Sequence, residues 1–390
     1  MGKRVQIGIA GTGFVGRGLA IALESQNDFA LSAVLTRREI ASIDNFPRKE
    51  KLTNSFQELV ERSDVIVECT GDAIHATNVV EHAFEAARPV VTMNAEFQVT
   101  AGSYYADRGI LTEAEGDQPG CIAALAEHAR EMGFTPIVYG NRKGFYRPDP
   151  VHEQMQFWAW KQGISITQVT SFTDGTKIQI EAALVANGLG AIIAQDGLIG
   201  VEADDLETGG IALARHAERL GFPISDYVLA PKAPAGVFLV VTGDPRQAAA
   251  LNYLKLGRGP FYVLVQNYHL CHMEIPKTIR RILRGEPPLL TNSHTPTVGI
   301  AAIAKRRLIP GERIERGIGS FDLRGVAVSI ADNPNHVPIG LISQARVVRP
   351  IEQGQLVING DLDLPDTLAL RAWQKISARA LETEIPALGH

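Results

Sequence analysis

No run of apolar residues in this 390-residue chain reaches the roughly 18 positions that a membrane-spanning helix needs, so we expect no membrane segment. The sequence has no excess of positive charge either. Its formal net charge is −5, which is unfavourable for binding nucleic acid or an anionic membrane surface. Cysteine is scarce: Cys69, Cys121 and Cys271 are widely spaced and odd in number, which argues against a disulfide framework. With no signal peptide before the first apolar run, these absences predict a cytoplasmic protein.

A glycine-rich stretch near the start of the chain is the most informative motif present. Residues 5–18 read VQIGIAGTGFVGRG, in which an apolar strand pattern meets three glycines and a helical pattern follows. The glycines permit a tight turn, a close approach of backbone N–H groups to a pyrophosphate, and close packing of helix on strand. We therefore predict a dinucleotide site, with an ordinary glycine-rich turn as the alternative. Its predicted cofactor-binding residues are Gly11, Thr12, Gly13, Phe14, Val15 and Gly16.

The end of the second expected strand, 30–36, bears on the choice of cofactor. An acidic residue there would hold the ribose 2′-hydroxyl of NAD, whereas arginines can pair with the 2′-phosphate of NADP. This chain has Thr36, Arg37 and Arg38 at that position. The pattern favours NADP(H) over NAD(H); the alternative is that both arginines are merely solvated.

Three further strands are expected in the N-terminal part, each followed by polar residues. They cover 63–71, 89–96 and 109–115, with helices at 74–87 and 121–132. Because the carboxyl ends of parallel strands meet at one edge of a sheet, Thr70, Gly71 and Asn94 are expected to lie along the cofactor. The alternation of strands and helices predicts an α/β fold with an N-terminal doubly wound Rossmann sheet.

The rest of the chain predicts two further units. The stretch 139–150 is polar and punctuated by Gly and Pro, which is typical of a loop at a domain junction. Beyond it we expect a strand at 164–172, an amphipathic helix at 178–193, loops over 194–225, and strands at 236–242 and 261–266, with helices at 245–254 and 276–284. Short strands are then expected at 298–304, 325–330, 345–348 and 355–358, before a terminal helix at 366–381. Two similar phrases, LIPGERI at 308–314 and IEQGQLV at 351–357, suggest that this last part is a compact β module.

These patterns predict a division into four parts. Residues 1–140 form a Rossmann domain, 141–290 a central α+β substrate and dimerisation domain, 291–365 the β module, and 366–390 a C-terminal helix. Such a chain is long enough for two or three domains with substantial cores.

Lys177 is the first candidate for chemistry. It follows an expected strand end, with Asp174 three residues before it and Glu181 one helical turn after it. A partly desolvated lysine can protonate or polarise an oxygen whose negative charge grows during hydride transfer. The alternative is a surface Lys–Glu pair that contributes only about 0.3 kcal/mol.

Other polar residues are weaker candidates. Lys143 lies in the loop expected at 139–150 and is either catalytic or simply solvated. Glu96 and Asp117 follow expected strands and could bind a polar substrate or a divalent cation, although most such carboxylates are exposed. His269 could donate to a substrate anion or be a buried structural histidine, and its spacing to His272 matches no zinc signature, so we assign no metal ligand.

Several motifs together resemble one enzyme group. They are the glycine-rich fingerprint, VTMNAE at 91–96, GDQP at 116–119, SFTDGTK at 171–177, GPFY at 259–262 and YHL at 268–270. This combination is similar to the homoserine-dehydrogenase-like oxidoreductases that carry a C-terminal SAF-like β module. The relatives with this layout include the deoxyxylulose-phosphate-reductoisomerase-like, or type II, enzymes, which use NADPH and form homodimers.

The resemblance implies roles for particular residues and leaves three hypotheses open. It places Asn94 and Glu96 between cofactor and substrate, and Asp117, Lys177 and His269 near a substrate pocket. The first hypothesis is an NADP(H)-dependent oxidoreductase acting on a small polar, phosphorylated or unphosphorylated hydroxy or oxo compound, as a homodimer or higher homo-oligomer. The second is a type II reductoisomerase of isoprenoid precursor synthesis. The third is a non-catalytic NADP(H)-binding sensor or assembly module.

Overall fold

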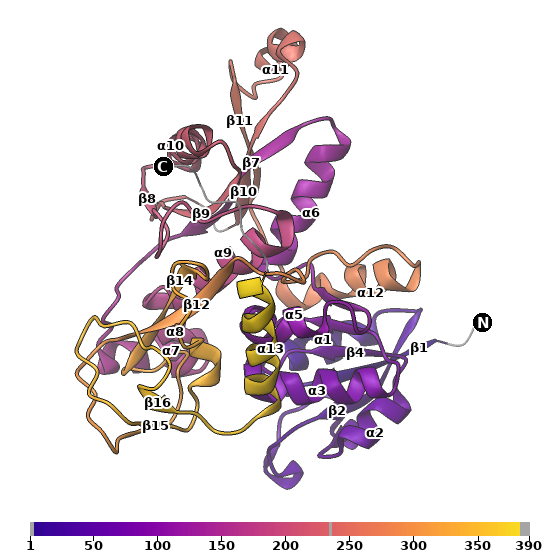
Figure 1. Cartoon of the computed structure of the whole chain (residues 1–390). Helices are drawn as coiled ribbons and strands as arrows, with labels where there is room; N and C mark the ends of the chain where they lie inside the picture. Colours follow the sequence, from indigo (N-terminus) through magenta and orange to yellow (C-terminus); the bar gives the residue numbers. More distant parts are fainter. Residues whose placement is uncertain (1–3, 234–235, 383–390) are drawn as a thin grey trace.

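The computed structural model describes residues 4–233 and 236–382 (Figure 1). The chain folds into an α/β structure with one large parallel sheet and further smaller sheets, which confirms the predicted fold class. Within those described ranges, no helix is both long and apolar enough to cross a membrane.

The N-terminal sheet is parallel and six-stranded, in the order β3-β2-β1-β4-β5-β6. Strand β1 lies between β2 and β4, and the strand order runs outward from it to β3 on one side and to β6 on the other. Dinucleotide-binding sheets have the same arrangement. The strands are β1 (Val5–Ala10), β2 (Phe29–Leu35), β3 (Leu52–Thr53), β4 (Val65–Glu68), β5 (Val90–Thr92) and β6 (Leu111–Glu113). Short 3₁₀ turns, η1 (Ile40–Ser42) and η2 (Lys49–Lys51), lie between β2 and β3.

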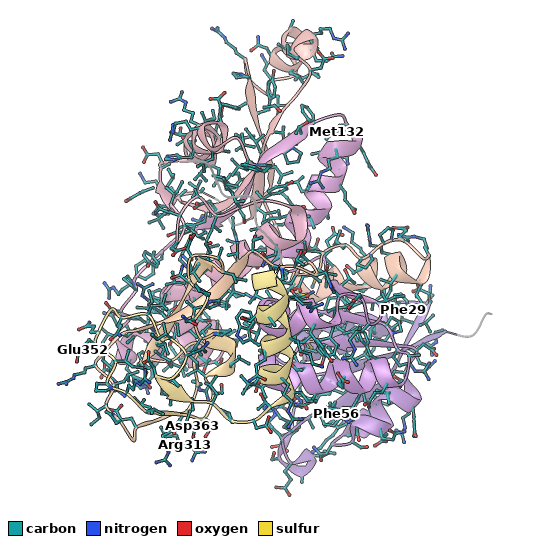
Figure 2. The ribbon with its side chains drawn as sticks, in the orientation of Figure 1. Phe29, Phe56, Met132, Arg313, Glu352 and Asp363 are labelled. Carbon is teal, nitrogen blue, oxygen red and sulfur yellow. The ribbon has the colours of Figure 1, made fainter. Side chains whose placement is uncertain are left out.

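Helices cover both faces of this sheet. One face is buried by α1 (Phe14–Glu24) together with α12 (Ile275–Leu283), which returns from much later in the chain. Phe29 lies in this layer at the right of Figure 2, and the Arg280 guanidinium of α12 stacks 4.9 Å from the centre of its ring. The other face is buried by α2 (Phe56–Arg62), α3 (Ala73–Glu85) and the helical stretch α4 (Ala95–Phe97), η3 (Gln98–Gly102) and α5 (Ser103–Tyr105).

The second sheet is mixed and has the order β11-β10-β7-β9-β8. Its strands are β7 (Thr135–Lys143), β8 (Val201–Glu202), β9 (Ile224–Leu229), β10 (Val237–Thr242) and β11 (Phe261–Gln266). Helices α6 (Gln118–Glu131) and α9 (Thr176–Leu189) contact one side of it, and α10 (Leu206–Leu220) contacts the other. The connection between β10 and β11, with η4 (Pro245–Gln247) and α11 (Ala248–Tyr253), extends away from the rest of the molecule at the top of Figure 1. A short turn, η5 (Cys271–Met273), then leads into α12.

Three expectations for this central part were wrong. The stretch 164–172 is not a strand but helix α8 (Ile166–Thr173), which follows α7 (His152–Gln162). The side chain of Ser165 accepts from the Gln168 backbone and Gln168 reciprocates, and this capping box starts the helix in spite of its β-branched residues. Residues 194–225 are not loop-rich, because α10 lies within them; the Asp205 side chain caps that helix. The expected loop at 139–150 begins instead within β7, the central strand of the sheet.

The position of α9 also differs from the sequence-based expectation. The pattern predicted a helix with one apolar face, but every residue from Ile178 to Asn187 is buried. Helix α6, strand β9 and the C-terminal module all pack against α9, so it lies at the centre of the largest hydrophobic core. The helix that carries Lys177 and Glu181 is therefore held on all sides.

The C-terminal module contains two small antiparallel sheets. Strands β12 (Val298–Ala304) and β14 (Leu323–Ser329) form the first sheet. The second sheet contains β13 (Arg313–Ile314), β15 (Ala345–Val347) and β16 (Leu362–Asp363). The turn η6 (Ile339–Leu341) lies between β14 and β15 in the chain. The two similar sequence phrases pair directly, since Leu308 and Ile351 exchange backbone hydrogen bonds of 2.9 and 3.0 Å. The strand expected at 355–358 is only a set of isolated bridges. Figure 2 shows the charged residues Arg313, Glu352 and Asp363 on the outer rim of the module.

The last helix, α13 (Leu368–Glu382), joins the module to the N-terminal domain. It contacts α3 and η3, and Trp373 packs edge-on against His336 of the module, with 5.2 Å between ring centres. Strand β7 crosses the boundary expected at residue 140, and α12 packs on the N-terminal sheet although it was expected to belong to the central domain. The division of the chain into four domains stays a prediction.

Candidate active site

The glycine turn has the geometry that a pyrophosphate-binding loop requires. Gly11 adopts φ +118°, a backbone conformation that suits glycine, and a Cβ on Gly16 would overlap the carbonyl of Gly11. Apart from the adjoining backbone, no atom of the described residues lies within 4 Å of the Cβ position of Gly13, so this side of the turn is open to a ligand. Gly13 is the N-cap of α1, whose first turn has no acidic residue and no side-chain cap. Its free N–H groups and positive helix end therefore suit a phosphate.

The residues at the end of β2 surround a cavity of about 440 Å³. Arg38 donates to the Thr12 hydroxyl at 2.7 Å and so reaches across the glycine turn, while Arg37 pairs with Asp72 at 2.8 Å. Thr36 lies 3.3 Å from Thr12 through their hydroxyl oxygens. The cavity lies where the adenosine half of a dinucleotide would extend from this turn, and two guanidinium groups line it.

A buried carboxylate connects the ends of β4 and β5. Glu68 accepts from the Thr70 backbone and hydroxyl at 2.7 and 2.6 Å, and from the Thr92 hydroxyl at 2.9 Å. Asn94 also approaches it, at 3.4 Å. Burial raises the pKa of Glu68, although these hydrogen bonds oppose the shift. Glu68 thus fixes the polar residues at this sheet edge.

Lys177 lies among carboxylates from three separate segments. Its Nζ is 3.4 Å from Glu96 Oε1, 3.4 Å from Asp117 Oδ2 and 3.8 Å from Glu181 Oε1. Glu96 follows β5 and Asp117 follows β6, so both come from the carboxyl edge of the same parallel sheet as the glycine turn. The Lys177 side chain is only 15% exposed, which excludes the solvated surface pair as an account of this residue.

The charges in this cluster, which we call the Lys177 cluster (Lys177, Glu96, Asp117 and Glu181), determine its protonation. Burial alone would lower the pKa of Lys177, but the charges of Asp117 and Glu96 raise it well above its usual value. Burial raises the pKa of Glu181 to about 8, despite the opposing effect of Lys177. At neutral pH the cluster therefore combines a firmly charged ammonium group with a carboxyl group that still holds its proton.

Lys143 and Asp174 are close to this cluster but have other partners. Lys143, at the end of β7, donates to the carbonyl of Phe172 at 2.5 Å, and burial lowers its pKa. Asp174 is fully buried and pairs with Lys305 of the C-terminal module at 2.6 Å. Asp174 follows a helix, not a strand, so the expected strand end before Lys177 was wrong.

His269 is not part of the Lys177 cluster. Within residues 4–233 and 236–382, no hydrogen bond or ion pair connects it to Lys177 or to the carboxylates. The neighbouring His272 instead packs on the fingerprint helix, edge-on to Phe14 with 5.7 Å between ring centres. Among the residues that the structure describes, no group of three or more His, Cys, Asp or Glu side chains is arranged to hold a metal ion.

Three residues with evident influence on the site were not singled out from the sequence. Glu68 could have been noticed, because it is an acid at the end of the apolar run 65–67. Asn141 donates to Glu181 at 2.6 Å but lies in the stretch that was expected to be a loop. Lys305 is 131 positions from Asp174, and no local sequence pattern indicates that contact.

Two segments that contribute residues to this site match known family models. Residues 11–106 match the family model described as homoserine dehydrogenase, NAD binding domain, and residues 116–275 match that described as oxidoreductase DRL, catalytic domain. No curated protein matches the chain.

Solved structures with a similar fold include several dehydrogenases. A probable dehydrogenase from Thermotoga maritima is 16% identical, over 74% of this chain and 91% of that one, with a TM-score of 0.43. Homoserine dehydrogenase from S. aureus is 13% identical, over 84% and 93% of the two chains, with a TM-score of 0.38. GenD2 from gentamicin A biosynthesis, solved in complex with NAD, is 13% identical, over 75% and 90%, with a TM-score of 0.40.

The chain is an NAD(P)-dependent oxidoreductase. More particularly, residues 11–106 are similar to the homoserine dehydrogenase NAD-binding domain, and residues 116–275 are similar to the oxidoreductase DRL catalytic domain. The hypothesis of a non-catalytic sensor is therefore set aside. The SAF-like nature of the β module stays a prediction.

Proposed function

We propose that this protein is an NADP(H)-dependent oxidoreductase that acts on a small polar hydroxy or oxo compound, with Lys177 handling the reacting oxygen. The observation that supports this most directly is the position of Lys177, which is ion-paired to two carboxylates at the same sheet edge as the glycine turn. A bound nicotinamide nucleotide would supply hydride transfer at a carbon that bears oxygen.

Each member of the Lys177 cluster has a distinct role in this proposal. The Lys177 ammonium group donates a hydrogen bond to the substrate oxygen and stabilises the negative charge that develops there as the carbonyl is reduced. Its proton passes to that oxygen to give the hydroxyl product. Glu181, 3.8 Å from Nζ and protonated below about pH 8, then returns a proton to Lys177. Glu96 and Asp117 orient the ammonium group and bind polar groups of the substrate.

NADP(H) rather than NAD(H) is proposed as the cofactor because of the end of β2. Arg37 and Arg38 line the cavity there, and the first residue after β2 is Thr36 rather than an acid, although Glu39 also lines the cavity. The hydrogen bond to Thr12 holds the side chain of Arg38 toward the glycine turn. The Arg38 guanidinium group is therefore positioned to donate to a 2′-phosphate.

The substitution Lys177→Met tests the proposed role of Lys177. Purified protein is offered L-homoserine with NADP⁺, and small oxo compounds with NADPH, and absorbance at 340 nm is followed. We expect kcat of the variant to fall by roughly 10²- to 10⁴-fold while NADPH affinity stays unchanged, because a general acid and charge stabiliser is lost.

The exposed Lys161 on α7, substituted by Met, is the matched control and should leave the rate unaltered. Turnover of Lys177→Met within about threefold of the wild type would remove Lys177 from the mechanism, since loss of such a group costs at least about 100-fold.

A type II reductoisomerase is the second candidate, and the match of residues 116–275 to the oxidoreductase DRL catalytic domain favours it. Protein given 1-deoxy-D-xylulose 5-phosphate, NADPH and Mn²⁺ should then oxidise NADPH, and chelation with EDTA should stop the reaction. A flat trace at 340 nm in the presence of metal would exclude this substrate. Activity on another oxo compound that persists in EDTA would support the first candidate instead.

A further inference from the structure

We propose that Lys305 of the C-terminal module is a positioning residue for the Lys177 site. By holding Asp174, it fixes the start of α9 and prevents the Asp174 carboxylate from pairing with Lys143. This inference rests on the proposed function, since it assumes that Lys177 acts on the substrate. It gives the module a part in the reaction without contact with substrate.

The Lys305–Asp174 pair is buried, and each of its side chains has a second hydrogen-bond partner. Lys305 Nζ lies 2.6 Å from Asp174 Oδ2 and donates to the carbonyl of Ser320 at 2.7 Å. The two side chains are 4% and 0% exposed. Removing one partner of such a pair leaves an uncompensated buried charge, so the other partner must find a new one. Asp174 therefore cannot simply turn to solvent when Lys305 is lost.

Asp174 in turn sets the first turn of α9. Its second carboxylate oxygen, Oδ1, accepts from the Thr176 backbone at 2.8 Å, immediately before Lys177. Gly175, in the left-handed region at φ +86°, is the only residue between Asp174 and the helix. A displacement of Asp174 would therefore be transmitted directly to Thr176 and Lys177.

The module also hydrogen-bonds to α9 through strand β14. The Gly325 backbone donates to the Thr176 hydroxyl at 2.8 Å, and the Ala327 backbone donates to Gln179 Oε1 at 2.8 Å. These two bonds fix the helix in register with the strand, on either side of Lys177 along the helix. Lys305 immediately follows β12, the partner strand of β14, so all three contacts come from one rigid unit.

Lys143 is the competing cation. It donates to the carbonyl of Phe172, two residues before Asp174, and the charge of Asp174 acts on its ammonium group. Without Lys305, Asp174 would turn toward Lys143 and draw the α8–α9 junction with it. Because a misplacement of about 1 Å can cost 10²-fold in rate, this movement would reduce catalysis without removing any group that touches substrate.

The experiment compares full-length Lys305→Met, Asp174→Asn and the double variant Asp174→Asn/Lys305→Met. Arg306→Met is the matched control, because Arg306 is the next residue and, in the part of the chain that the structure describes, its ion pairs are with Glu312 and Asp322 of the module. Folding of each variant is checked by urea unfolding, and kcat and KM are measured with whichever compound of the panel above is turned over.

We expect Lys305→Met to lower kcat by about 100-fold with KM for NADPH changed less than threefold, and Arg306→Met to behave like the wild type. The double variant should recover at least tenfold over Lys305→Met, because it holds no unpaired carboxylate. Lys305→Arg should recover part of the rate. A kcat for Lys305→Met equal to that of Arg306→Met, or a double variant no faster than Lys305→Met, would overturn the proposal.

A crystal structure of Lys305→Met separates this inference from the proposed function. If no compound of the panel is turned over, the proposed function fails, but the structure still decides the inference. We expect the Asp174 carboxylate within about 4 Å of Lys143 Nζ, the range of an ion pair. If Asp174 has not moved in this structure, and still accepts from the Thr176 backbone away from Lys143, the proposed positioning role of Lys305 is contradicted.

Discussion

At the scale of single residues, the site combines a charged lysine with a protonated carboxyl group in a partly buried place. A lysine whose pKa is raised is a weak acid in the free enzyme, so in the mechanism that we propose Lys177 acts first as a charged donor to the substrate oxygen. Its proton becomes available as the oxygen gains negative charge. The carboxyl group of Glu181, which lies one helical turn away and has a raised pKa, then supplies a replacement proton to Lys177.

Glu181→Gln should remove the alkaline limb of the pH–rate profile for reduction. The wild-type carboxyl holds a proton below about pH 8 and loses it above, so kcat should fall as pH rises through that value. The glutamine cannot relay a proton, so its kcat should be lower at pH 7 and nearly flat from pH 7 to 9. A wild-type alkaline limb that survives unchanged in the variant would show that another group supplies the proton.

The raised pKa of Glu181 should also make the free energy of unfolding depend on pH. Because the folded-state pKa of Glu181 is raised, the folded protein binds more protons than the unfolded chain between about pH 4.5 and 8, and this carboxyl makes the free energy of unfolding fall across that window. Glu181→Gln removes this contribution, so urea unfolding should show the variant gaining stability relative to wild type as pH rises from 5 to 8. If the difference in unfolding free energy between Glu181→Gln and wild type did not change with pH, the raised pKa of Glu181 would be contradicted.

At the scale of elements, we propose that the residues at the end of β2 determine the preference for NADP(H). Arg38→Ala should weaken NADPH binding by roughly 10- to 100-fold and leave NADH binding nearly unchanged, because a charge-assisted hydrogen bond to the 2′-phosphate is lost. Calorimetry with both nucleotides measures this. Arg62→Ala, which removes an exposed i,i+4 pair with Glu58 on α2, is the control. Equal losses for NADPH and NADH would mean that Arg38 supports the glycine turn and does not recognise the 2′-phosphate.

Elements with a clear repeating pattern could be predicted from the sequence. The fingerprint strand and helix, the parallel strands that follow and the two pairing phrases at 308 and 351 are local patterns, and they predicted structure well. Helix α8 was missed because its β-branched residues outweighed the Ser165 capping box in the interpretation. Helix α10 was missed because of Gly209 and Gly210, where close packing on the second sheet leaves little room for a side chain.

The site itself was only partly predictable. The proximity of Lys177 to Glu181 follows from helical spacing, and Glu96 and Asp117 follow strands of one sheet. By contrast, the pairing of Asp174 with Lys305 depends on how the C-terminal module docks on α9, which no local pattern encodes. Lys143 was expected in a loop because its neighbours Gly140 and Gly144 suggested one, although pairing with β9 and β10 places it at the end of a strand.

At the scale of the whole molecule, the C-terminal segment holds the N-terminal domain and the module together. Trp373 of α13 is 7% exposed and lies in a cluster with Ile330 and Leu341 of the module, while α13 also contacts α3. The module is therefore fixed both to helix α9 and, through α13, to helix α3 of the N-terminal part.

Trp373→Ala should lower the free energy of unfolding by about 3 kcal/mol, because it removes a large buried side chain and leaves a cavity. Urea unfolding followed by far-UV circular dichroism measures the loss. Trp160→Ala, at a position that is 80% exposed on α7, is the matched control and should change stability by less than about 0.5 kcal/mol. Equal effects of the two substitutions would mean that α13 contributes little to the joined structure.

If Lys177 handles the reacting oxygen, the Lys177 cluster must face the carbon that gains or loses hydride. A crystal structure of the full chain with NADP⁺ tests it most directly. We expect the 2′-phosphate against Arg38, the pyrophosphate on the glycine turn, and Lys177 Nζ within reach of an oxygen placed about 3 Å from nicotinamide C4. A nicotinamide ring directed away from Lys177, with C4 facing no member of the cluster, would contradict the account.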